Sequence, residues 1–150
     1  MSLGDFFPKD LKESFAKRNI EIGNAILIKI PDFTVSYDKY VILVAKDKNN
    51  ISIAYVVINS IANPKVAFNS YLKSLHLKID EKRHPFLKKD SFVDCSNLRE
   101  FLIEDIVNFL TKYPERLVGN VNPKLLQTIL LLLSKSKTIE TYKKKKYNLL

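Results

Sequence analysis

The sequence has one cysteine, two histidines and three glycines in 150 residues, and each scarcity excludes a class of site. Cys95 alone can build neither a disulfide framework nor a thiolate metal site, and we interpret it as a small buried hydrophobe. The glycines lie far apart, so no glycine-rich loop can hold a nucleotide cofactor, and no serine lies in a glycine-flanked hydrolase turn. His76 and His84 have no partner pair, and we interpret both as surface residues. We therefore expect no metal and no cofactor.

Long apolar runs are also missing. No run reaches the ~20 residues that cross a bilayer, and the first residues lack the charged-then-apolar layout of a signal peptide. We expect a cytoplasmic protein without membrane contact. With 46% hydrophobic and 27% charged residues, a chain of this length fits one domain over residues 1–150.

Acidic residues are outnumbered. The chain has 25 Lys and Arg against 16 Asp and Glu, a net charge of +9, which favours a polyanionic partner such as nucleic acid. The alternative explanation of the positive charge is that an AT-rich genome encodes many lysines and asparagines regardless of function. We interpret residues 141–150 as a mobile basic tail, in which Tyr142 and Tyr147 stack bases while four lysines hold phosphates, or else as a tail that is only solvated.

Three apolar, β-branched runs follow a predicted amphipathic helix at residues 5–19, which has apolar residues at four-residue spacing. The runs are residues 25–30, 40–45 and 51–58. Their composition favours strands, and the short polar connections between them favour an antiparallel meander. Alternation of apolar and polar residues over 75–79 predicts a half-exposed strand that pairs with the one near Phe92.

A turn, a strand and a helix start are predicted within residues 84–101. Pro85 disfavours helix at the residue before it, and residues 87–95 combine charged and apolar side chains as a strand does. Ser96 and Asn97 then offer a helix cap, with Glu100 within capping-box reach and apolar residues at helical spacing beyond it. These signals predict a helix over residues 98–111.

The last predicted helix covers residues 123–136, with Asn122 as N-cap and Pro123 at the first helical position. It is apolar nearly all round, which predicts burial in the core or in a homodimer interface. Together the elements predict an α+β fold with five or six strands in a strongly curved antiparallel sheet and three main helices.

In this order, with the segment LKKDSFVDCSNLREF in the middle, residues 22–136 resemble the MazF/PemK family of toxin ribonucleases. The resemblance implies a small SH3-like barrel that cleaves single-stranded RNA without a metal, a homodimer, and a short acidic antitoxin as partner. The alternative is a barrel that has lost the chemistry and binds nucleic acid, or that binds a protein through the helix at residues 5–19.

In that family an arginine of an Arg-Pro pair opens the second strand and a threonine or serine closes the third. The matching positions here are Lys39-Tyr40 and Asn59-Ser60, so the resemblance implies Lys39 and Ser60 as catalytic residues, although a lysine lacks the bidentate fork of arginine. The basic side chains that we expect to bind RNA are Lys65, Lys73, Lys82, Arg83, Lys88, Lys143, Lys144, Lys145 and Lys146.

Overall fold

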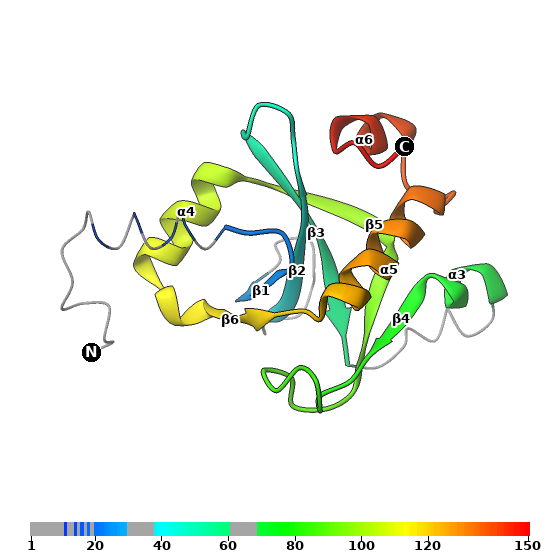
Figure 1. The fold of residues 1–150 in the computed structure, drawn as a ribbon, viewed down its shortest axis with the longest axis horizontal. Helices are drawn as coiled ribbons and strands as arrows, with labels where there is room; N and C mark the ends of the chain where they lie inside the picture. The colour runs from blue at the N-terminus through cyan, green and yellow to red at the C-terminus, as the bar shows by residue number, and fades with distance from the viewer. Residues whose placement is uncertain are drawn as a thin grey trace.

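The computed structural model describes residues 11, 14, 16, 18, 20–29, 38–60 and 69–150. Six antiparallel strands form one strongly curved sheet in the order β4-β5-β3-β2-β1-β6 (Figure 1). The strands are β1 (Asn24–Ile28), β2 (Lys39–Lys46), β3 (Ser52–Asn59), β4 (His76–Ile79), β5 (Ser91–Leu102) and β6 (Leu117–Asn120). The described helices are α3 (Ser70–Ser74), α4 (Ile103–Lys112), the 3-10 turn η2 (Pro114–Arg116), α5 (Pro123–Lys135) and α6 (Thr141–Lys146). The predicted α+β fold with a curved antiparallel sheet is confirmed.

Strands β2 and β3 are apolar except at their ends because the sheet is covered on both faces. Successive side chains of a strand point to opposite faces. Ile42 and Val44 accordingly belong to a core that includes residues of α5, whereas Val41 and Leu43 belong to a second core that includes residues of α4. Figure 1 shows α4 and α5 on opposite sides of the sheet. We call these the α5-side core and the α4-side core.

The predicted meander of β1, β2 and β3 is confirmed by antiparallel registers that pair Ile26 with Val41 and Val41 with Val57. The predicted pairing of the strand near residue 77 with the one near Phe92 is also confirmed, because Lys78 lies opposite Phe92. The predicted helix over residues 5–19 lies outside the described residues, apart from four residues that are helical.

The predicted helix start at Ser96 and Asn97 is wrong. Strand β5 continues through these residues to Leu102, and α4 begins at Ile103 without a side-chain cap. The reason is long-range pairing, since the end of β5 lies in register with the start of β3 and the ring of Phe101 stacks on Tyr55 with centroids 4.0 Å apart. The start of the predicted strand also differs, because residues 87–89 belong to the preceding loop.

The connection between α4 and α5 contributes an unpredicted strand. Residues 117–120 pair with β1 as the edge strand β6, with Asn120 opposite Asn24. The predicted N-cap of α5 is confirmed, because the side chain of Asn122 accepts a hydrogen bond of 2.9 Å from the backbone N–H of Lys124. Only part of α5 faces the core, since Ile129 is buried whereas Leu131 is 53% exposed. The homodimer stays a prediction.

The C-terminal segment has a defined place in the fold, in contrast to the predicted mobile tail. Residues 141–146 form α6, and the side chains of Tyr147 and Leu149 are buried in the α5-side core. Thr138 Oγ1 donates a hydrogen bond to the backbone oxygen of Ser96, and Lys143 Nζ donates one of 2.9 Å to that of Leu98. The segment therefore covers part of β5 beyond the residues that pair with β4.

Candidate functional site

A cleft of about 600 Å³ opens at the end of the sheet where β2 begins and β3 ends. Because these strands are antiparallel, their termini meet there, and the loop between β4 and β5 adds a third side. We call residues 80–90 of that loop the lysine loop. The described residues that line the cleft are Leu27, Asp38, Lys39, Tyr40, Ile58, Ser60, Leu87, Lys88, Lys89 and Ser91.

Both residues that the family resemblance implied as catalytic line this cleft. Lys39 is the first residue of β2, and its Nζ lies 3.3 Å from Oδ1 of Asn59, the last residue of β3. Ser60 follows Asn59 and is exposed. The antiparallel pairing of Tyr40 with Ile58 is what brings the two strand ends together.

The lysine loop adds two more cations to the lining. Lys88, which we expected to bind RNA, and Lys89, which we did not single out, are both exposed and both line the cleft. In a strand these neighbours would point to opposite faces, but residues 87–89 are not in a strand. Three lysines from two distant segments therefore line one cleft.

The cleft lining also contains a carboxylate, that of Asp38, which is paired with Arg116. The guanidinium Nη1 of Arg116 donates to Oδ2 of Asp38 and lies 3.5 Å from the backbone oxygen of Leu27. Arg116 comes from η2, on the far side of β1, and nothing in the sequence indicated this partnership. The arginine balances the aspartate, and the exposed Lys88 and Lys89 add positive charge to the part of the lining that the structure describes.

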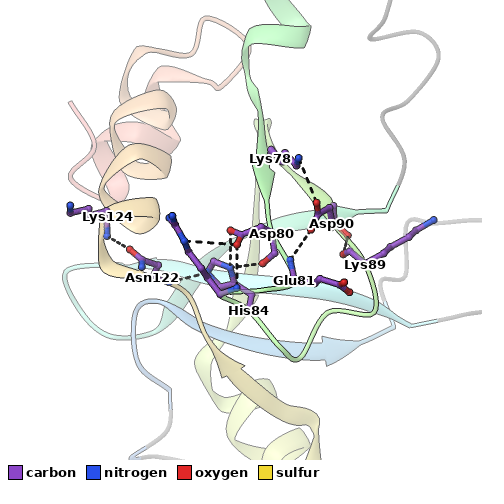
Figure 2. Close-up of polar contacts among 10 residues, drawn as sticks. Lys78, Asp80, Glu81, His84, Lys89, Asp90, Asn122 and Lys124 are labelled. Carbon is purple, nitrogen blue, oxygen red and sulfur yellow. Dashed lines mark hydrogen bonds and ion pairs between the residues drawn. The ribbon is translucent and has the colours of Figure 1, made fainter.

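Carboxylates within and beside the lysine loop fix its backbone (Figure 2). Asp90 accepts a hydrogen bond of 2.9 Å from the backbone N–H of Glu81, and Asp80 accepts one of 3.2 Å from that of Arg83. The hydrogen bond from Glu81 lowers the pKa of Asp90, and the ammonium of Lys78 acts in the same direction. These local bonds explain how a loop with four basic residues keeps one conformation.

His84, at the centre of the lysine loop, is buried, so the prediction of a surface histidine is wrong. Its Nδ1 lies 2.9 Å from the backbone oxygen of Asp80, and its Nε2 lies 3.1 Å from the backbone nitrogen of Asn122. A backbone N–H can only donate, so Nε2 accepts and Nδ1 carries the proton. Figure 2 shows the imidazole between the loop and the start of α5.

The side chain of His76 is also nearly enclosed, at 5% exposure. Its Nδ1 lies 2.7 Å from the backbone oxygen of Leu72 and its Nε2 lies 3.3 Å from the carboxylate of Asp94. The part of the chain that the structure describes contains no group of three or more His, Cys, Asp or Glu that could hold a metal ion.

The remaining basic residues expected to bind RNA lie away from the cleft lining or outside the described residues. Lys73 is on α3, whereas Lys82 and Arg83 lie in the lysine loop, with Arg83 3.9 Å from Asp80. Lys65 lies outside the described residues.

Three of the four tail lysines have partners within the chain itself. Lys144 is buried and its Nζ donates to the backbone oxygen of Ser134 at 3.0 Å, Lys143 is bonded to Leu98 as described, and Lys146 pairs with Glu100 at 3.1 Å. Only Lys145 of the four has no side-chain partner among the described residues. Burial of Tyr147 also removes its ring from any base-stacking role. Most of these side chains therefore hold the C-terminal segment to the rest of the protein.

Cys95 is buried, as predicted. Burial and the neighbouring charge of Asp94 raise the pKa of its thiol to about 12. Because the thiolate is the reactive form, Cys95 is unsuited to act as a nucleophile.

None of the helices that the structure describes has the length and the apolar stretch needed to cross a bilayer. Compared with known protein families and with curated proteins, the chain matches none of them.

Proposed function

We propose that the cleft binds single-stranded RNA through its phosphate groups. The observation that carries this proposal is the convergence of Lys39, Lys88 and Lys89 on one cleft whose carboxylate is already paired with an arginine. Lysine ammonium groups act as point charges for phosphates, and their binding energy is electrostatic and independent of base sequence.

The floor of the cleft favours a nucleotide over a simple anion. Leu27, Tyr40 and Ile58 supply apolar and aromatic surface between the lysines. A free phosphate gains nothing from contact with apolar surface, whereas a base stacks on an aromatic ring and buries its faces against apolar side chains. RNA rather than DNA follows from the family resemblance, and a short acidic antitoxin peptide is the rival occupant of the same lysines.

The test is the affinity of a fluorescein-labelled oligouridylate, measured by fluorescence anisotropy over a range of salt concentrations. Three phosphate contacts correspond to a log-log salt slope of about −2 with the single-strand coefficient. Replacing either Lys88 or Lys89 by glutamate is expected to weaken binding strongly, and replacing both is expected to abolish it. The matched control is Lys48→Glu, because Lys48 is exposed at the opposite end of the β2–β3 hairpin.

Three outcomes separate the alternatives. Equal affinity for a deoxyribose oligonucleotide would mean that the cleft does not select RNA. Tighter binding of a labelled polyglutamate peptide, lost in the same lysine variants, would favour a protein partner. An oligouridylate affinity that Lys48→Glu reduces as much as the cleft variants would mean that only net charge is involved, and the proposed site would be wrong.

Cleavage of the bound RNA is a second candidate function, favoured by the presence of Lys39 and Ser60 in the same cleft. An ammonium at the phosphate stabilises the charge that develops when the 2′-oxygen attacks phosphorus and the 5′-oxygen leaves. The hydroxyl of Ser60 would orient the phosphate. Among the described residues of the lining there is no histidine, and the carboxylate of Asp38 is engaged by Arg116, so these residues supply no base for the 2′-hydroxyl. We therefore favour RNA binding over RNA cleavage as the proposed function.

A further inference from the structure

We infer that His84 is a positioning residue for the cleft, and that only its neutral form holds the lysine loop in place. The inference rests on the proposed binding of RNA and adds a dependence on pH to it. Its basis is the geometry of one imidazole that joins two segments distant in the sequence.

The ring of His84 is 1% exposed and is bonded at both ends to the backbone. Nδ1–H donates to the oxygen of Asp80 within the lysine loop, whereas Nε2 accepts from the N–H of Asn122, where the chain passes from β6 into α5. One end therefore belongs to the loop and the other to the body of the protein. The imidazole, together with Leu87 in the α5-side core and Phe86 against Tyr40, therefore holds the loop to the sheet.

A short series of contacts leads from this ring to the cleft. The backbone oxygen of His84 accepts a hydrogen bond of 3.0 Å from the N–H of Leu87, which lines the cleft. The ring of Phe86 lies edge-on to His84, with centroids 6.1 Å apart, and 5.7 Å from the ring of Tyr40 in the cleft floor. Lys88 follows directly, so a displacement of His84 moves the cationic side of the cleft.

Protonation acts on one end of the bridge only. A cationic imidazole carries hydrogen on both nitrogens, so Nδ1 keeps its bond to the oxygen of Asp80, whereas Nε2 becomes a donor that faces the N–H of Asn122. Two donors opposed in a buried site leave both unsatisfied. The loop then keeps its own bond to the ring and loses its bond to the body.

The charged groups around the ring determine where the cation can go. Asp80 lies 3.8 Å from Nδ1 and favours the added charge, while Arg83 pairs with the same carboxylate. On the other side, residues 117–126 contain no acidic residue, and they include Lys124 at the start of α5. A protonated ring is therefore drawn towards its own loop and away from α5.

The other groups near the loop do not change in the same way. Asp90, whose pKa is lowered by the hydrogen bond from Glu81, stays ionised in mild acid and keeps the loop closed on itself. Both nitrogens of His76 face acceptors, so protonation strengthens its contacts with Leu72 and Asp94. Among these groups, only His84 loses a hydrogen bond when it is protonated.

The test is the affinity of the full chain for a labelled oligouridylate, measured from about pH 8 down to the lowest pH at which the chain stays folded. Uracil does not titrate there, and added positive charge on the protein would by itself tighten binding. We expect the opposite, a loss of about tenfold, as one buried hydrogen bond gives way to an unpaired donor.

His84→Gln is the informative variant, because its amide oxygen can accept from Asn122 and its amide nitrogen can donate to Asp80, yet it does not titrate. It should bind as the unchanged protein does at about pH 8 and should keep that affinity in acid. His76→Gln is the matched control and should retain the loss in acid.

Amide hydrogen exchange of Asn122 provides a measurement that needs no RNA and no variant. After correction for the intrinsic effect of pH, its protection should fall in acid while that of Glu81 is retained. Constant protection of Asn122, or an acid loss of affinity that persists in a folded His84→Gln protein, would overturn the inference. A protein that binds no oligouridylate at any pH would refute the proposed function, whereas the exchange result would still decide whether His84 releases the loop.

Discussion

Two adjacent leucines at the end of the chain give the sharpest test of the fold. Leu149 is 8% exposed and belongs to the α5-side core, whereas Leu150 is 70% exposed. Replacing a buried leucine by alanine costs about 2 to 5 kcal/mol. Because Leu149 is not completely enclosed, we expect Leu149→Ala to lower the free energy of unfolding by about 2 kcal/mol, at the low end of that range. Leu150→Ala should change it by less than about 0.5 kcal/mol.

Urea unfolding followed by far-ultraviolet circular dichroism measures both variants under one condition. The slope of free energy against urea should be unchanged, so that the midpoints report stability alone. In thermal unfolding, about 2 kcal/mol corresponds to a Tm lowered by roughly 4 to 8 °C for a chain of this size. Equal midpoints for the two variants would refute the packing of the C-terminal segment on the core and would restore the mobile tail.

Three further outcomes are expected. If the cleft cleaves RNA, Lys39→Ala should lower the cleavage rate on the order of 10²-fold and Lys39→Arg should raise it. The rate is measured on labelled RNA in the presence of EDTA. If neither change alters the rate, Lys39 has no part in catalysis. Gly119→Ala should destabilise the protein by about 1 to 3 kcal/mol, because its Cβ would lie 2.7 Å from Cδ1 of Phe86, and a Gly119→Ala, Phe86→Leu double variant should recover part of the loss. Cys95 should resist iodoacetamide at about pH 8 until the chain is unfolded, and rapid alkylation of the native protein would contradict its burial.

The elements that the sequence predicts well are those set by local signals. Asn122 and Pro123 define the start of α5 through one side-chain hydrogen bond and one fixed backbone angle, and neither depends on the rest of the chain. The apolar runs of β2 and β3 are recognisable because both faces of these strands are covered. The hydrophobic pattern and the helix cap were therefore sufficient to predict these elements.

The boundary between β5 and α4 shows where local signals fail. A helix cap contributes about 1 kcal/mol, and Ser96 offered one. Its N–H and its hydroxyl instead both bind the carboxylate of Asp94, at 2.9 and 2.5 Å, and the residues beyond it pair with β3. The stacked rings of Tyr55 and Phe101 and a ladder of backbone hydrogen bonds outweigh one cap. No window of the sequence contains that information.

The candidate site divides in the same way. Lys39 and Ser60 were found because each stands at a strand end that the family pattern marks. Arg116 and His84 were not, because their partners Asp38 and Asn122 are 78 and 38 residues away in the sequence. Such pairs exist only once the sheet order is known, and a buried neutral histidine has no signature in composition.

Net charge is therefore a poor guide to where a polyanion would bind. Lys143, Lys144 and Lys146 account for a third of the excess of nine positive charges, and each has its ammonium bonded to a backbone oxygen or a carboxylate of the chain itself. Moving such a group to a phosphate would require breaking a bond that holds α6 in place. Lys88 and Lys89 could contact a phosphate without breaking such a bond, because both are exposed and have no side-chain partner among the described residues. It follows that the most basic stretch of the sequence is not its best candidate for an RNA contact, and that two lysines in a loop are.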